Sequence, residues 1–159
     1  MNFARYLEFF PEIELPVVLS PDAHHDFSQA NEALPGALLE EFVLPFEPQE
    51  ADELTEYVPC FRIPKTEQFH ALVLWRAGLL DYQYILMTYT QQAELIDRRV
   101  IAGTYYDGKL LTQSVATFDE DGSIYIVSGQ NKADVDIYDA ATSRSYELEL
   151  LPDGTIGNT

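Results

Sequence analysis

Three apolar runs follow one another closely between residues 69 and 104, and they restrict the fold more than any other feature of the chain. The runs, at residues 69–76, 82–89 and 95–102, are rich in aromatic and β-branched residues, which favour strands. Only the short segments AGLLD and TQQAE separate them. Connections this short join antiparallel neighbours and cannot hold the crossover of a parallel pair. The stretch therefore predicts three consecutive antiparallel strands.

The same pattern continues to the end of the chain. Further strands are expected at residues 110–118, 123–128, 135–138 and 146–151, with Asp-Gly pairs in the turns between some of them. Two of these pairs, at residues 121 and 153, lie 32 residues apart, so a duplicated hairpin unit stays open beside ordinary meander turns. The fold class is mainly β (α+β): an antiparallel meander of six to eight strands forming a curved sheet or an open barrel.

Proline and glycine divide the chain near residue 65. Eight of the nine prolines lie at or before Pro64, and seven of the eight glycines lie after it. Frequent prolines exclude long helices and central strands. We therefore expect a single domain, with an acidic, Pro-rich arm over residues 1–65 and the β-meander over residues 66–159.

Short elements are expected within the arm. Residues 2–10 predict a helix with Asn2 as its N-cap, and Pro35 begins a second helix. Residues 13–19 predict an edge strand or an extended segment, residues 20–33 a polar loop or weak helix, and residues 52–58 another helical turn. Strands 69–76 and 82–89 are apolar on both faces, so the arm should pack on one of them.

The charge is strongly negative and uneven. The formal net charge is −18, and residues 1–60 hold thirteen acidic residues against one basic residue, Arg5. Such a surface repels nucleic-acid phosphates and anionic lipid head groups. A basic protein is the partner that the charge favours, although solubility alone also explains it. No secretory signal peptide or transmembrane run is seen, so a cytoplasmic location is expected.

Two groups of residues are candidates for contact with a ligand or a partner. Aromatic residues on neighbouring strands either line a pocket for a flat or apolar ligand or belong to the core: Trp75, Tyr82, Tyr84 and Tyr89. Acidic residues of the arm and tyrosines of one turn are candidates for protein contact: Glu40, Glu41, Glu47, Glu50, Asp52, Glu53, Tyr105 and Tyr106.

Chemistry-bearing motifs are weak. The cluster His24-His25-Asp26 lacks ligands at a fixed spacing and is expected in a solvated loop. The run at residues 119–122 lacks the later ligands of a calcium loop and predicts a hairpin turn. Cys60 is expected to be a packing residue and His70 a half-buried histidine. We assign no catalytic residue, no metal site and no cofactor.

Two segments resemble known families. The run YILMTYTQQAELID followed by VIAGT resembles a β-meander phrase of small proteins from Bacteroidetes-type bacteria; the similarity spans about residues 69–128 and implies no activity. The segment LPGALLEEFVLP, residues 34–45, is similar to a helix of the SMI1/KNR4 immunity superfamily. That family continues with an Asn-Gly-Gly-like turn, where this chain has Pro-Phe-Glu. The resemblance implies a small acidic protein that neutralises a basic toxin.

The first functional hypothesis is a soluble, non-enzymatic protein-interaction module of the immunity-protein type that uses an acidic surface. The alternative is a small-molecule binder with an aromatic-lined pocket near Trp75. A homodimer through a sheet edge or an exposed apolar face stays open, and an enzyme is not favoured.

Overall fold

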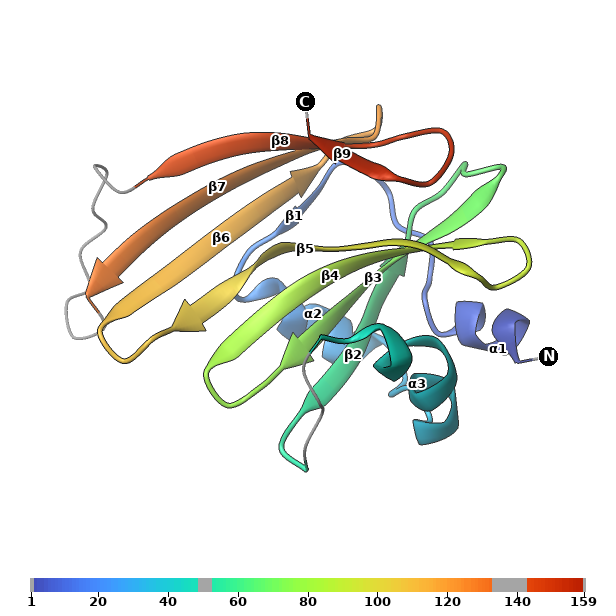
Figure 1. Cartoon of the computed structure of the whole chain (residues 1–159), viewed down its shortest axis with the longest axis horizontal. Helices are drawn as coiled ribbons and strands as arrows, with labels where there is room; N and C mark the ends of the chain where they lie inside the picture. The colour runs from blue at the N-terminus through green and yellow to red at the C-terminus, as the bar shows by residue number, and fades with distance from the viewer. Residues whose placement is uncertain (1, 49–52, 133–142, 159) are drawn as a thin grey trace.

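The computed structural model describes residues 2–48, 53–132 and 143–158, and it is dominated by one curved antiparallel sheet (Figure 1). The helices are α1 (Phe3–Glu8), α2 (Ala23–Ala30), α3 (Gly36–Phe42) and the short 3-10 helix η1 (Leu44–Phe46). The strands are β1 (Val17–Leu19), β2 (Glu56–Arg62), β3 (Phe69–Ala77), β4 (Asp81–Thr90), β5 (Leu95–Tyr106), β6 (Leu110–Phe118), β7 (Ser123–Lys132), β8 (Arg144–Leu150) and β9 (Ile156–Asn158).

The described part of the sheet is a meander. Strands β2 to β9 lie in sequence order, each antiparallel to its neighbour, and β1 pairs with β6 beside this path. The sheet is curved without closing into a barrel. The predicted fold class is therefore confirmed, with eight strands in the meander and β1 added to it. The strand expected at residues 135–138 lies outside the described residues.

The sheet curls because β5 leaves β6 partway along its length. β5 pairs with β6 only from Gly103 to Tyr106, whereas it pairs with β4 along almost its whole length. The edge of β6 that β5 leaves is taken by β1, whose Leu19 pairs with Ala116. Bulges between β4 and β5 add to the bend. The two halves of the sheet thus enclose one concave core.

That concave core draws on almost every strand. Alternate residues of β3 and β4 point into it, as the period of a strand requires, and they meet residues of β6, β7, β8 and β9 from the other half. Its largest fully buried members include Phe61, Tyr84 and Phe118. The helix α2 and strand β1 lie along the open side, because α2 contacts β1 and β2.

The convex face of β3 and β4 is covered by the arm, as predicted. Helices α1 and α3 lie over these strands (Figure 1). Their aromatic residues Phe3, Tyr6 and Phe42 form a second core cluster with Leu72, Leu74, Ile85, Met87 and Tyr89 of the sheet. Tyr89 attaches both helices to the sheet, since its hydroxyl donates to the carbonyl of Phe42 in α3 at 2.7 Å and lies 3.2 Å from the hydroxyl of Tyr6 in α1.

Three local predictions in the arm have different outcomes. Asn2 occupies the predicted N-cap position of α1, but its side chain makes no capping hydrogen bond, and its amide nitrogen donates to Glu41 of α3 at 3.4 Å. Residues 23–30 form helix α2, which is the helix alternative for residues 20–33, so the solvated loop expected around the histidine pair is wrong. Residues 56–62, where a helical turn was expected up to residue 58, form strand β2.

Strand β2 tolerates a proline because it lies at the edge of the sheet. Pro59 sits beside a bulge at Cys60, which lets Cys60 and Phe61 both enter the concave core. The side-chain amide of Asn31 donates to the carbonyls of Pro59 and Cys60, at 2.7 and 2.9 Å. This side chain covers acceptors that an exposed edge would otherwise present to another chain.

Candidate functional site

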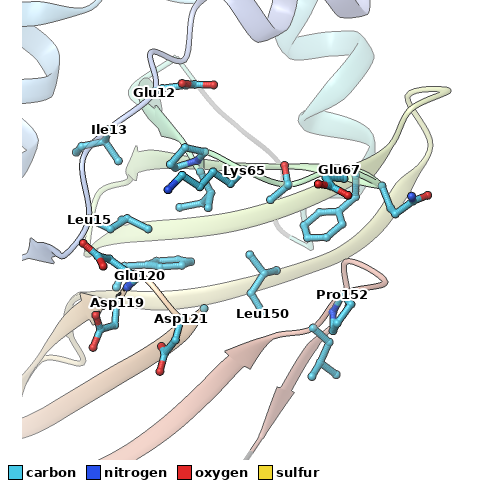
Figure 2. A pocket seen from close by; sticks show the side chains of 18 of the residues that line it. Glu12, Ile13, Leu15, Lys65, Glu67, Asp119, Glu120, Asp121, Leu150 and Pro152 are labelled. Carbon is cyan, nitrogen blue, oxygen red and sulfur yellow. Dashed lines mark hydrogen bonds between the residues drawn. The ribbon is translucent and has the colours of Figure 1, made fainter.

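A pocket of about 900 Å³ opens at one end of the curved sheet (Figure 2). Four segments that are distant in sequence surround it: residues 12–15 of the arm, residues 63–69 from the end of β2 to the start of β3, residues 118–122 from the end of β6 through the β6–β7 turn, and residues 150–152 at the end of β8. The pocket therefore exists only because the meander curls and the arm crosses its open end.

The inner wall of the pocket is apolar. Ile63, Phe69 and Phe118 are buried members of the concave core, and Ile13 and Leu150 pack against that core from the pocket side. Leu15 and Leu150 point toward the hollow in Figure 2. The pocket is thus a place where the apolar core reaches the surface, and a ligand there would bury apolar area.

The rim of the pocket is acidic. Six carboxylates line it: Glu12, Glu14, Glu67, Asp119, Glu120 and Asp121. Lys65 is the single basic residue in the lining. Glu12 has a nearby cation, since Arg62 lies 3.8 Å from it, in an exposed pair that water screens. The rim therefore carries a strong excess of negative charge.

Tight turns hold the acidic rim in place. In the β6–β7 turn, Gly122 adopts φ +89° and its amide donates to the carbonyl of Asp119 at 3.2 Å. The carboxylate of Asp121 accepts the amide of Ser123 at 2.9 Å, and this bond lowers the pKa of Asp121. The carbonyl of Gly122 then accepts the amide of Leu150, which joins this turn to the end of β8.

The turn from β8 to β9 is anchored on the opposite half of the sheet. The carbonyl of Gly154 accepts the hydroxyl of buried Thr88 at 2.6 Å. A Cβ on Gly154 would lie 2.7 Å from Ile96 and 3.1 Å from Phe69, so only glycine allows this approach. Asp97 accepts the amide of Ile156 at 2.8 Å and completes the attachment.

Three of the four aromatic candidates are neighbours, since Tyr82 stacks on Trp75 and Trp75 pairs with Tyr84, whereas Tyr89 lies on the other face of the sheet. Trp75 and Tyr84 belong to the concave core and Tyr89 to the convex one, and all three are buried. Only Tyr82 is substantially exposed, at 48%. Its ring stacks on Trp75 at 5.6 Å between centroids, and the ring of His24 stacks on Trp75 at 4.2 Å. Helix α2 therefore covers Trp75, which the sequence did not reveal.

A second, smaller cavity of about 190 Å³ lies beside Tyr82. Tyr105 of β5 and Tyr146 of β8 also line it, and both are about half exposed. Tyr105 was a protein-contact candidate. Its neighbour Tyr106 is less exposed and bonds locally, since its hydroxyl donates to the carbonyl of Gly108 at 3.0 Å.

The acidic candidates of the arm have different environments. Glu40, Glu41 and Glu53 are exposed, whereas Glu50 and Asp52 lie outside the described residues. The side chain of Glu47 is only 3% exposed. A partner that docks on the surface cannot reach this carboxylate.

Glu47 is held by a cluster of charges on the convex side of the sheet. Its carboxylate lies 2.9 Å from Arg98 and 3.6 Å from Arg76, and Arg76 also lies 3.6 Å from Asp81. The hydroxyl of Tyr57 donates to Glu47 at 3.4 Å. The cluster holds two carboxylates and two guanidinium groups, and it fastens the end of the arm to the sheet.

The remaining candidates have ordinary structural roles. Cys60 is 1% exposed, and burial raises the pKa of its thiol far above the usual value. His70 bonds to the side chain of Gln91 at 2.8 Å. Within the described residues, no group of three His, Cys, Asp or Glu side chains is arranged to hold a metal ion. No helix in that part of the chain is long and apolar enough to cross a membrane.

Sequence reasoning missed the pocket, although two local signals point to it. The segment Glu-Ile-Glu-Leu at residues 12–15 alternates acidic and aliphatic residues, and in the structure its carboxylates are exposed while Ile13 and Leu15 are half-buried. The turn Asp-Glu-Asp-Gly at residues 119–122 adds three further acids. Comparison with protein-family models, curated proteins and solved structures found no match in any of the three.

Proposed function

We propose that this protein is a non-enzymatic binding module that takes a basic, partly apolar segment of a partner protein in the pocket of Figure 2. The observation that carries the proposal is the position of six carboxylates around an apolar wall that is continuous with the core. Neither the charge nor the wall alone would select a partner, but together they select a cationic segment that carries large apolar side chains.

The acidic rim supplies attraction and selectivity. A surface of one sign speeds the association of an oppositely charged partner and repels one of the same sign. Since the chain carries a formal net charge of −18, phosphate-rich partners are disfavoured over the whole surface, and the rim adds to this at the pocket. Each exposed ion pair contributes about 0.2–1 kcal/mol, so several are needed for useful affinity.

The apolar wall supplies the rest of the binding energy. Full burial of a leucine or phenylalanine side chain stabilises a complex by about 1.5–3 kcal/mol. A cavity of about 900 Å³ is large enough for more than one such side chain. A purely charged polymer such as polylysine lacks these groups, so it should bind more weakly than an amphipathic peptide.

The lowered pKa of Asp121 suits binding better than acid catalysis. A general acid at neutral pH needs a raised pKa. Asp121 at the rim has a lowered pKa instead, because a backbone amide donates to its carboxylate. It is therefore charged at neutral pH, as an attractive rim requires.

Neutralisation of a basic toxin, as in immunity proteins, is the biological role that we include in this proposal. The partner class follows from the charge of the pocket. We do not extend the proposal to a homodimer through the β2 edge, because Asn31 already bonds to the carbonyls of Pro59 and Cys60 there.

A labelled amphipathic peptide tests the proposal. The probe is the fluorescein-labelled heptapeptide Lys-Leu-Lys-Phe-Lys-Leu-Lys, and fluorescence anisotropy measures its dissociation constant at low and high salt. The triple variant Glu14→Gln, Glu67→Gln, Glu120→Gln removes three exposed rim charges. We expect a loss of about 1–3 kcal/mol, or roughly 5- to 150-fold, and weaker binding as salt rises.

A matched variant makes the test specific to the pocket. Glu40→Gln, Glu41→Gln, Glu53→Gln changes the net charge by the same amount at exposed positions of the arm that do not line the pocket. The control should lose much less affinity. An equal loss in both variants would show that the peptide responds to net charge or to the arm, and would overturn the assignment to the pocket.

A further inference from the structure

The arm segment at residues 12–15 borders the acidic pocket with its backbone as well as with its side chains. All four of its residues line the pocket, and the segment forms one side of the hollow in Figure 2. Neighbouring side chains of an extended chain point to opposite sides. A hollow that is bordered by four consecutive residues therefore runs along the backbone edge of the segment.

The side chains of this segment alternate as those of a strand do. Glu12 and Glu14 are exposed, whereas Ile13 and Leu15 are half-buried and pack against the concave core. Charge thus lies on one side of the segment and apolar surface on the other, with the backbone between them.

The segment begins beside a strand and then loses its partner. The amide of Arg62, the last residue of β2, donates to the carbonyl of Pro11 at 2.9 Å. The arm next pairs with the sheet where β1 begins. Between these points, no hydrogen bond within the described part of the chain involves the backbone of Glu14 or Leu15. Main-chain donors and acceptors therefore border the pocket without a protein partner.

We infer that the partner's basic segment binds as an extended strand along residues 12–15. A strand added to an exposed edge gains affinity from main-chain hydrogen bonds and specificity from alternate side chains. Side chains opposite each other on paired strands share a face of the sheet. A partner that alternates basic and apolar residues would place its cations beside Glu12 and Glu14, and its apolar groups beside Ile13 and Leu15.

This inference rests on the proposed function, because it takes the pocket as the binding site of a basic segment, and it adds the conformation of that segment. The alternatives are an amphipathic helix, whose apolar residues recur three and four positions apart, and a chain held by its side chains alone. Both alternatives leave the backbone of the arm unpaired.

Two isomeric peptides separate a strand from a helix. Lys-Leu-Lys-Phe-Lys-Leu-Lys alternates, whereas Lys-Leu-Lys-Lys-Leu-Phe-Lys has the same composition and charge with its apolar residues at helical spacing. By fluorescence anisotropy, we expect the alternating peptide to bind at least about fivefold more tightly. Equal or tighter binding of its isomer would overturn the strand and leave the pocket as a peptide site. If neither peptide bound saturably, the proposed function would fail as well.

N-methylation of the alternating peptide tests the main-chain bonds, because it removes N–H donors and keeps every charge and side chain. Alternate amides of a strand point to opposite sides. One analogue is methylated at the three apolar residues, and the other at the three lysines after the first. We expect one analogue to lose at least about tenfold in affinity and the other less than about threefold. Equal losses would contradict pairing along one edge.

Amide hydrogen exchange examines the same bonds from the side of the protein. The amides of Glu14 and Leu15 should exchange rapidly in the free protein, and at least one should slow about tenfold or more when the alternating peptide saturates the pocket. The amide of Leu79, in the exposed β3–β4 turn, is the control and should keep its rate. Unchanged exchange at both arm amides would overturn the inference.

Discussion

Replacement of Glu47 by glutamine should destabilise the fold strongly, because it removes the charge that balances two arginines. The carboxylate lies 2.9 Å from Arg98 and 3.6 Å from Arg76, and the three side chains are 3%, 16% and 5% exposed. With Asp81, the cluster is neutral, with two charges of each sign. Glu47→Gln leaves it with a net positive charge away from water.

The magnitude follows from this burial. Removal of one partner from a buried ion pair costs about 3–5 kcal/mol. The lower end applies here, since Arg76 keeps Asp81 and the amide oxygen of glutamine still accepts a hydrogen bond. We therefore expect a loss of about 3 kcal/mol, which for a domain of this size lowers the melting temperature by roughly 6–12 °C.

Urea unfolding followed by circular dichroism measures this loss. Glu40→Gln makes the same chemical change at an exposed position of α3, and should alter the free energy of unfolding by less than about 0.5 kcal/mol. If the two variants differed by less than that amount, the cluster would not fasten the arm to the sheet, and the role given to Glu47 would be refuted.

Three further predictions concern single groups. Gly154→Ala should cost about 2–4 kcal/mol, because its φ is +89° and its Cβ would overlap Ile96, whereas Gly108→Ala, with φ +99° but open space, should cost about 1 kcal/mol in thermal unfolding. Cys60 should react with a thiol reagent in denaturant but not in the native protein, and rapid native labelling would contradict its burial. Burial raises the pKa of Tyr84 and Tyr89 above the value near 10 that tyrosine has in the unfolded chain. Keeping both groups uncharged therefore stabilises the fold fully below about pH 10, and this stabilisation is lost as the pH rises further. Tyrosinate absorbance should accordingly show these groups ionising only together with cooperative unfolding, and ionisation in the native state would refute this.

The meander could be predicted because its signals are local. Alternation in β3 and β4, and the Asp-Gly turns after β6 and β8, each depend on neighbours in sequence. The burial of both faces of β3 and β4 could also be predicted, since strands that are apolar on both sides must be buried on both. Strand β2 was missed because Pro59 argues against a strand, and only its place at the sheet edge makes the proline acceptable.

The candidate sites could not be predicted because they depend on the curl of the sheet. The acidic rim joins Glu14 to Asp119 across a separation that no local pattern encodes. The burial of Glu47 is likewise invisible in sequence, since nothing near it indicates that Arg76 and Arg98 lie opposite. Charge composition led only to the proposal of a basic partner, and the structure was needed to locate an acidic pocket.

Methyl chemical shifts measured during peptide titration test most directly whether the acidic pocket is the binding site. With the Lys-Leu-Lys-Phe-Lys-Leu-Lys peptide, the methyl signals of Ile13, Leu15 and Leu150, which line the pocket, should shift and saturate together. The methyl groups of Leu79 and Leu80, exposed at the β3–β4 turn, should stay unchanged. Shifts at that turn without shifts at the pocket, or no saturable shift at all, would contradict the proposed function.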